Sequence, residues 1–160
     1  MAKDGELSQI CTKKEFERFK SNCYYFAYGS NMSQEQMAHR CPRAVFVDTA
    51  KLCGYRFIIN ERGVATIVPD QSRKVYGTLW KITEACEKSL DAREGVNWGT
   101  YRKTTIDVKQ CKGKLITALT YIANNVSRGS GRDDYMEKII AAAERWRLPN
   151  KYLAELKSWL

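Results

Sequence analysis

A run of aromatic residues that ends at a glycine is the feature that most constrains how this chain folds. Residues 23–28 read CYYFAY, a short aromatic run bounded by polar residues, which is typical of a buried strand. Gly29 breaks the run, and Ser33 and Gln36 beyond it have the spacing of a capping box that opens a helix. The sequence therefore predicts a strand, a glycine turn and a helix in direct succession.

The turn at residues 28–31 is a candidate anion site. Glycine lets a ligand approach the backbone closely, and the free N–H groups near a helix start attract negative charge. In an ordinary connection, however, Ser30 and Asn31 would simply satisfy local backbone groups. The residue pattern alone leaves both interpretations open.

Glu94 is the candidate acid–base group. Thr83 is placed to cap a short helix that ends near Glu94 and Gly95, because glycine commonly terminates helices. A carboxylate at a helix C-terminus opposes the macrodipole, so Glu94 needs a partner. The neighbouring cations that could provide one are Arg93, Arg102 and Lys103. Without further information, a solvated surface role is the commoner one for such a glutamate.

Four segments, in this order, resemble the gamma-glutamylcyclotransferase family. They are residues 26–32 (FAYGSNM), 75–82 (VYGTLWKI), 90–96 (LDAREGV) followed by Tyr101, and 148–152 (LPNKY). The resemblance implies an α+β fold in which a single domain, residues 22–160, is built on a small mixed β-barrel-like sheet surrounded by helices. Residues 1–21 form a polar N-terminal extension to which the sequence assigns no role.

The resemblance also implies an enzyme that cyclises a gamma-glutamyl amino acid or dipeptide to 5-oxoproline. The family's catalytic glutamate falls on Glu94, and its substrate loop falls on Tyr28, Gly29, Ser30 and Asn31. Tyr101 and Tyr135 resemble family tyrosines that lie near the pocket and donate hydrogen bonds to the glutamate or to the substrate. Each of these two tyrosines fits the role of a half-buried core aromatic equally well.

The reaction needs only groups that these residues supply. The α-amino group of a gamma-glutamyl compound attacks its own γ-carbonyl, so the substrate itself provides proximity. A carboxylate can take a proton from the ammonium and return it to the leaving amine, while backbone N–H groups stabilise the oxyanion. We therefore expect Glu94 to act as general base and acid, with a pKa raised by partial burial. No metal, nucleotide or other cofactor is expected.

Composition argues against several other classes of protein. The single histidine, His39, disfavours a zinc site and a Ser–His or Cys–His catalytic pair. Six cysteines without a Cys-x-x-Cys pair, and without a signal peptide, favour free thiols in a cytoplasmic protein. No apolar stretch approaches the roughly 20 residues that a membrane span requires.

The net charge of +9 raises the question of nucleic acid as a partner. The excess of cations is +3 in residues 1–60, +4 in residues 61–120 and +2 in residues 121–160, so no basic tail or block concentrates it. Nucleic acid is therefore not expected, although folding can still gather charge on one face. A positive potential also attracts anionic gamma-glutamyl substrates.

Hydrophobic patterns predict the remaining elements. Strands are expected at residues 44–47, 52–59, 64–68, 75–82, 101–108 and 114–122. Gly77 within its strand indicates a bulge or a close backbone approach. An amphipathic helix is expected over residues 134–147, with Asp134 and Glu137 as its start signal, and a short helix after Pro149. The basic link at residues 127–132 lacks the Pro-Ser of the family, which makes it a candidate selector of the leaving group.

Two alternatives to a general gamma-glutamylcyclotransferase remain at this point. The same ring closure could serve a specialised gamma-glutamyl amine, such as an isopeptide or a protected metabolite. The chain could also be a non-catalytic module that binds small anions or nucleic acid. The partner expected from the resemblance is a small-molecule gamma-glutamyl substrate, and a homodimer is left open.

Overall fold

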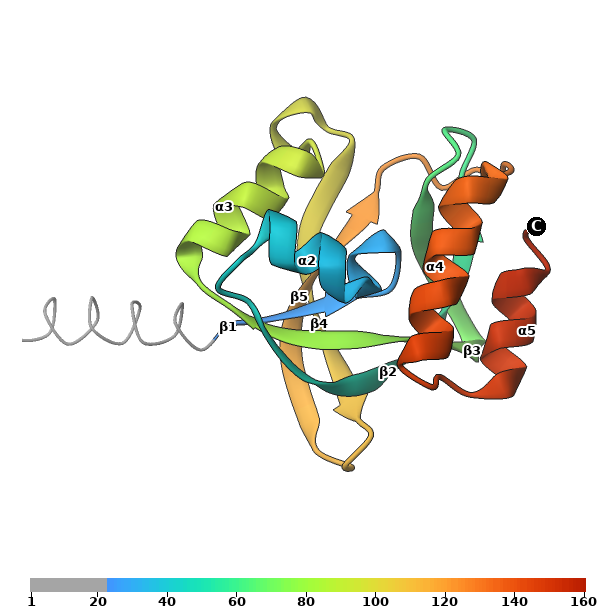
Figure 1. Cartoon of the computed structure of the whole chain (residues 1–160). Coiled ribbons are helices and arrows are strands. Elements are labelled where there is room, and N and C mark those ends of the chain that lie inside the picture. The colour runs from blue at the N-terminus through green and yellow to red at the C-terminus, as the bar shows by residue number, and fades with distance from the viewer. Residues whose placement is uncertain (1–22) are drawn as a thin grey trace, which may run out of the picture.

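A closed five-stranded barrel forms the centre of the computed structural model, which describes residues 23–160 (Figure 1). Its strands are β1 (Cys23–Ala27), β2 (Val45–Ile59), β3 (Ala65–Ile82), β4 (Tyr101–Gln110) and β5 (Leu115–Ala123). The helices are α2 (Gln34–Arg40), α3 (Glu84–Arg93), α4 (Asp133–Arg145) and α5 (Asn150–Lys157), with 3-10 turns η1 (Ser30–Met32) and η2 (Val96–Trp98). The predicted α+β single domain is confirmed, and the extension at residues 1–21 lies outside the described residues.

The barrel is mixed, in the strand order β1-β3-β2-β4-β5. β1 pairs antiparallel with β3 and closes the barrel by pairing parallel with β5, where Tyr25 lies opposite Leu119. Gly77 makes the predicted close backbone approach, because a Cβ atom added there would collide with the carbonyl oxygen of Ala27. The C-terminal end of β1, which carries the glycine turn, is thereby held against β3.

Four of the predicted strands merge into two. Residues 45–47 and 52–59 lie in β2, and residues 65–68 and 75–82 lie in β3, so two of the predicted strands begin one residue late. Most residues between them remain paired across the two strands, with register shifts at Phe46/Asp48 and Cys53/Tyr55, the second of which leaves residues 70–73 unpaired. Backbone pairing does not require apolar side chains, so a hydrophobic pattern marks only the buried parts of such long strands.

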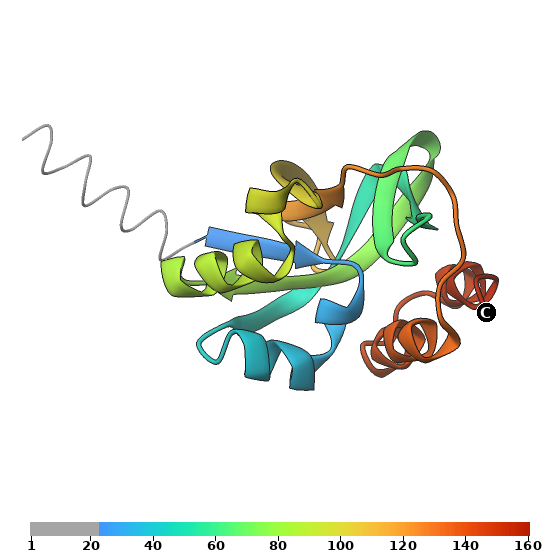
Figure 2. The same cartoon turned by 90° about the horizontal axis from the view of Figure 1, so that it is seen from above.

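Helices α4 and α5 pack on one side of the barrel and α3 lies toward the other (Figure 2). The ring of Trp146 stacks on Phe46 with 4.0 Å between centroids, and its Nε1 donates a 2.7 Å hydrogen bond to the carbonyl oxygen of Met32. The C-terminal end of α4 is therefore tied to η1, beside the glycine turn. The predicted start signal of this helix is wrong: its N-cap is Arg132, which makes no side-chain capping bond, and α4 begins at Asp133.

Two further observations concern membrane-spanning segments and the cysteines. Within residues 23–160, no helix combines the length and apolarity needed to cross a membrane. The cysteines at positions 23, 41, 53, 86 and 111 form no disulfide bond with one another. Burial raises the pKa of Cys41, whose Sγ lies 3.7 Å from the carbonyl oxygen of Cys86, to about 12.

Candidate functional site

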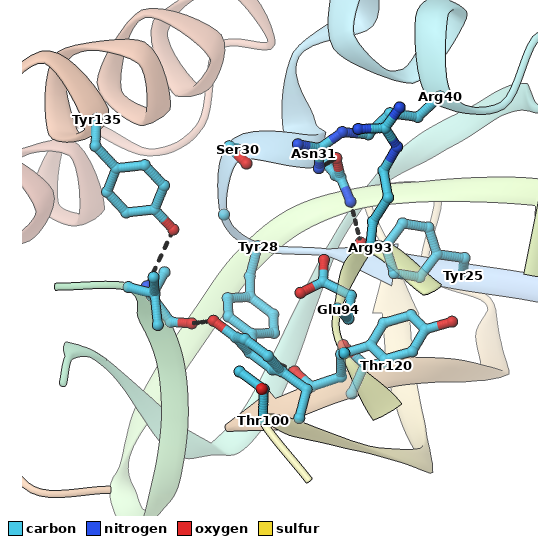
Figure 3. A pocket seen from close by; sticks show the side chains of 16 residues that line it. Tyr25, Tyr28, Ser30, Asn31, Arg40, Arg93, Glu94, Thr100, Thr120 and Tyr135 are labelled. Atoms are coloured by element: carbon cyan, nitrogen blue, oxygen red, sulfur yellow. Dashed lines mark hydrogen bonds between the residues drawn. The ribbon is translucent and has the colours of Figure 1, made fainter. Parts of the chain in front are cut away.

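A cavity of about 290 Å³ opens where β1 ends and where β3 and β4 begin (Figure 3). We call it the Glu94 cavity. Every site residue predicted from the sequence lines it: Tyr28, Gly29, Ser30, Asn31, Glu94, Tyr101 and Tyr135. The other lining residues are Tyr25, Arg40, Val64, Ala65, Arg93, Gly95, Thr100, Thr120 and Tyr121. Segments that lie far apart in the sequence thus meet at one end of the barrel.

Glu94 reaches the cavity because α3 ends there. As predicted, the side chain of Thr83 caps α3, accepting a 3.2 Å bond from the N–H of Cys86. Glu94 is the C-cap, and its N–H donates to the carbonyl oxygen of Leu90 at 2.8 Å. Gly95 follows with φ +64°, a left-handed conformation that favours glycine. The turn at Gly95 leaves the Glu94 side chain pointing toward Ser30 and Asn31 (Figure 3).

The carboxylate of Glu94 is half-buried and makes no hydrogen bond or ion pair within residues 23–160. Burial raises its pKa above the usual value, and the positive charge of Arg40 partly opposes that shift. Of the three possible partners, Lys103 is engaged elsewhere, because it pairs with Glu87 at 3.1 Å and with Asp91 at 2.9 Å. Arg102 does not line the cavity, whereas Arg93 does. The protein therefore keeps a proton-binding group available to a ligand.

The glycine turn presents unused backbone donors. The bonds of η1 run from the N–H of Met32 to the carbonyl oxygen of Gly29, at 3.1 Å, and from the N–H of Ser33 to that of Ser30, at 3.0 Å. The N–H groups of Ser30 and Asn31 have no acceptor within residues 23–160. Gly29 has φ −112°, so no left-handed backbone requires a glycine here. The absence of a side chain instead leaves room beside Ala65, because a Cβ atom at position 29 would lie 3.4 Å from the Cβ atom of Ala65.

Side chains hold the turn in place. Ser33 accepts from the N–H of Gln36 at 3.2 Å, as a capping box predicts. The amide of Gln36 does not return to Ser33; it donates instead to Ser30 Oγ and Asn31 Oδ1, both at 2.8 Å. Asn31 Oδ1 also accepts from Arg40 at 2.8 Å, and its Nδ2 donates to the Tyr25 hydroxyl at 3.0 Å. Asn31 is therefore fixed from several directions.

Tyr101 and Tyr135 both bind the peptide groups of Ala65, and not Glu94. The hydroxyl of Tyr101 donates to the Ala65 carbonyl oxygen at 2.7 Å, whereas the hydroxyl of Tyr135 accepts from the Ala65 N–H at 3.0 Å (Figure 3). Burial raises the pKa of both phenols, so both stay protonated. The hydroxyl proton of Tyr135 is thus free to be donated to a ligand, whereas that of Tyr101 is already donated to Ala65.

Comparisons with known proteins agree with this arrangement. Residues 74–156 match the model of the AIG2-like family. A mouse gamma-glutamylcyclotransferase is 33% identical, with the match covering 84% of this chain and 77% of that protein, and the human enzyme is 31% identical over the same shares. The chain belongs to the gamma-glutamylcyclotransferase family. A solved gamma-glutamyl cyclotransferase structure superposes with a TM-score of 0.81 at 30% identity, covering 86% of this chain and 88% of the other.

Some residues of this family member's cavity escaped the sequence reasoning. Arg40, Thr100 and Thr120 lie in unremarkable helical, loop and strand contexts, and only folding shows that they face Glu94. Arg40 did carry one signal, since it is in the last turn of the helix that follows the glycine turn. Within residues 23–160, no group of three or more His, Cys, Asp or Glu side chains is placed to hold a metal ion. His39 is exposed on α2.

The link at residues 127–132 is not part of the cavity lining, contrary to the expectation that it selects the leaving group. It is fixed to the β2–β3 turn: the N–H of Gly129 donates to the carbonyl oxygen of Ile59 at 2.8 Å, and a Cβ atom at Gly129 would collide with the backbone of Asn60. The guanidinium of Arg128 lies 4.3 Å from the centre of the Trp159 ring. The cations that line the cavity are Arg40 and Arg93.

Proposed function

We propose that this protein is a gamma-glutamylcyclotransferase that converts a gamma-glutamyl amino acid or dipeptide to 5-oxoproline and releases the amino acid. One observation carries this proposal: the carboxylate of Glu94, which has no protein partner within residues 23–160, faces a turn with unused N–H donors. Family membership and this pairing of a proton carrier with an oxyanion cradle point to the same reaction.

In the proposed reaction, the ionised Glu94 takes a proton from the substrate's α-ammonium group. The freed amine nitrogen attacks the γ-carbonyl carbon and forms the five-membered ring. The N–H groups of Ser30 and Asn31 stabilise the negative charge that develops on the carbonyl oxygen, a contribution of about 3 kcal/mol per donor in other enzymes. Protonated Glu94 then gives its proton to the leaving nitrogen as the carbon–nitrogen bond breaks. The regenerated carboxylate takes the second proton from the ring nitrogen, which leaves the neutral lactam, and passes it to the released amine, which departs as an ammonium ion.

The tyrosines have different parts in this proposal. Tyr135 binds the substrate, because its hydroxyl keeps a proton after accepting from the Ala65 N–H. Tyr101 positions Ala65 through the carbonyl group. Tyr28, whose hydroxyl donates to the carbonyl oxygen of Tyr121, fixes β1 against β5 beneath the turn. Burial raises the pKa of Tyr28, so it also stays neutral beside Glu94.

Arg93 is placed to select the leaving group. Arg40 is engaged by Asn31, but Arg93 makes no hydrogen bond or ion pair within residues 23–160. Its guanidinium lies at the same side of the cavity as Arg40 (Figure 3). Arginine binds carboxylates with paired hydrogen bonds, so a leaving amino acid that carries a carboxylate should be preferred over a simple amine.

The test is release of 5-oxoproline, measured by mass spectrometry, from gamma-glutamyl-alanine and from gamma-glutamyl-ethylamide. These two substrates differ only in the carboxylate of the leaving group. Wild-type protein should turn over both, with kcat/KM at least about tenfold higher for the alanine compound. Arg93→Gln should remove that preference by weakening turnover of the alanine compound alone. Equal kcat/KM values in the wild type would show that Arg93 does not select the leaving group.

The same assay separates the broader alternatives. Glutathione and gamma-glutamyl-lysine join the panel, and their rank against gamma-glutamyl-alanine identifies a general or a specialised enzyme. No release from any of these compounds by folded protein would contradict the proposed reaction. A cytoplasmic location and a homodimer remain predictions, to be checked by cell fractionation and by light scattering on the purified protein.

A further inference from the structure

A second hollow, of about 480 Å³, lies at the other end of β4 from the Glu94 cavity. It is bounded by the turn that joins β4 to β5 and by the link between α4 and α5. Both of these segments lie in the lower half of Figure 1. We call it the cationic groove. Its lining residues are Thr49, Ala50, Lys51, Tyr76, Lys109, Gln110, Cys111, Lys112, Gly113, Arg147, Leu148 and Pro149.

The lining contains four cations, Lys51, Lys109, Lys112 and Arg147, and no carboxylate. None of the four side chains makes an ion pair or hydrogen bond within residues 23–160. The neighbouring carboxylate of Asp48 is engaged by backbone groups, because it accepts from the N–H of Thr49 at 2.9 Å and from the N–H of Lys112 at 3.2 Å. The groove therefore holds positive charge that the described protein does not neutralise.

Two of these lysines lie directly opposite each other. Lys51 of β2 pairs with Lys109 of β4 in the register of the barrel. Like charges at directly opposed positions of neighbouring strands destabilise a sheet. An anion bound between the two ammonium groups would turn this repulsion into attraction.

Arg147 adds an independent sign of function. It has φ +57° and is the one residue other than glycine with a left-handed backbone in residues 23–160. Its N–H donates to the carbonyl oxygen of Glu144, and the N–H of Leu148 donates to that of Ala143, both at 3.0 Å, which is the pattern of a helix end that normally places glycine here. Strain of this kind is often retained where a side chain has a function.

Gln110 supplies a polar group without a partner. It is only 9% exposed, and its side-chain amide makes no hydrogen bond within residues 23–160. Its amide atoms are not among the fully buried polar atoms that lack a partner, so solvent reaches them. Its NH₂ group is a donor that an anionic oxygen can accept from.

We propose that the cationic groove binds a diphosphate group. A single phosphate carries a charge of about −2, which leaves much of the positive charge of the groove unbalanced. Two joined phosphates approach the charge of the four cations and offer enough oxygen acceptors for the lysines and Arg147. The volume of the groove is within the usual range for small-molecule sites. The diphosphate comes either as inorganic pyrophosphate or as part of a nucleoside diphosphate, whose base would lie near Tyr76.

Calorimetric titration tests the proposal with pyrophosphate, a nucleoside diphosphate and orthophosphate, at constant ionic strength set with sodium chloride. Pyrophosphate or the nucleoside diphosphate should bind more tightly than orthophosphate, and Lys51→Gln or Lys109→Gln should weaken that binding about tenfold each. Lys88→Gln, which removes an exposed cation of α3 that pairs with Glu84, is the control and should bind like wild type. Whichever diphosphate binds more tightly identifies the source.

Arg147→Gly separates a binding role from a structural one. Glycine relieves the left-handed strain, so this variant should melt at a higher temperature than wild type, by about 3 °C, while its diphosphate affinity falls about tenfold. Unchanged affinity in this folded variant would overturn the role of Arg147.

Three results would overturn the site as a whole. The first is equal loss of binding in Lys88→Gln, which would indicate a general charge effect. The second is competition by 5-oxoproline, which would place the anion in the Glu94 cavity. The third is binding of a short single-stranded RNA, by gel shift, more tightly than either diphosphate and with the same dependence on Lys51 and Lys109, which would make nucleic acid the ligand.

Discussion

The Glu94 cavity and the cationic groove lie at opposite ends of β4 and differ in whether their polar groups have partners within the protein. In the cavity, Asn31 is fixed by bonds to Tyr25, Gln36 and Arg40, and Ala65 is held by two tyrosines. In the groove, the four cations and the Gln110 amide have no partner within residues 23–160. The cavity is preorganised, as a catalytic site requires, whereas the groove is completed only by a ligand.

The largest effect is expected at Glu94 itself. Glu94→Gln removes the proton carrier, so kcat should fall at least about a hundredfold, the usual contribution of general acid–base catalysis. The melting temperature at neutral pH should rise, because the folded-state pKa of Glu94 is raised and its ionised form destabilises the fold. The wild type should accordingly lose stability as pH increases from the unfolded pKa of the carboxyl through the folded one. Full turnover by the variant would remove Glu94 from the mechanism.

The two tyrosines on Ala65 provide a matched pair of variants. Tyr135→Phe removes a hydroxyl with a free proton and should lower kcat/KM about tenfold. Tyr101→Phe leaves the Ala65 carbonyl oxygen without its donor and should destabilise the fold by about 1–2 kcal/mol, with a smaller effect on kcat/KM. Steady-state kinetics and thermal unfolding of both variants test this division of roles. The reverse pattern would assign substrate binding to Tyr101.

The pH profile reports how Arg40 acts on the cavity. Arg40 lowers the pKa of Glu94 against the effect of burial. Arg40→Gln should therefore move the acidic limb of the kcat/KM profile to higher pH, since a base with a higher pKa is protonated over a wider range. An acidic limb that stays in place, in a variant that still turns over substrate, would show that the limb does not belong to Glu94.

The smallest expected effects are changes in melting temperature at two glycines, one beside the Glu94 cavity and one beside the cationic groove. Gly95 beside the cavity and Gly113 beside the groove both have left-handed backbones, with φ +64° and +91°. Alanine costs about 1 kcal/mol for that backbone at either position, but only at Gly95 does its Cβ also press on Thr100, at 3.0 Å from Oγ1. Gly95→Ala should thus lower the melting temperature by several degrees, and Gly113→Ala by about 3 °C. Equal shifts would mean that Thr100 moves aside freely.

The sequence predicted the local parts of the cavity well. The aromatic strand, the glycine turn, the Ser33 cap and the end of α3 at Glu94 all depend on residues close to one another in the chain, and all are confirmed. The partners of the site residues could not be read in the same way. Tyr101 and Tyr135 meet at Ala65, which is 36 and 70 residues away, and no local pattern marks such an encounter.

The distribution of charge on the folded protein could not be predicted from the sequence either. Counted along the chain, the excess of cations is nearly uniform, and that uniformity argued against nucleic acid as a partner while leaving open that folding gathers charge on one face. The barrel register then places Lys51 against Lys109, and the α4–α5 link brings Arg147 beside them. Each of these lysines and Arg147 is unremarkable in sequence, and the groove exists only through pairing of residues from separate strands and helices.

β4 runs from the Glu94 cavity to the cationic groove, and this restricts which insertions and deletions the protein can tolerate. Its first residue, Tyr101, lines the cavity, and its last two, Lys109 and Gln110, line the groove about 30 Å away. Inserting or deleting one residue between them would turn the remaining side chains to the opposite face of the sheet. Descendants of this chain are therefore expected to keep the length of β4 fixed, and to vary more freely in the turn that follows it.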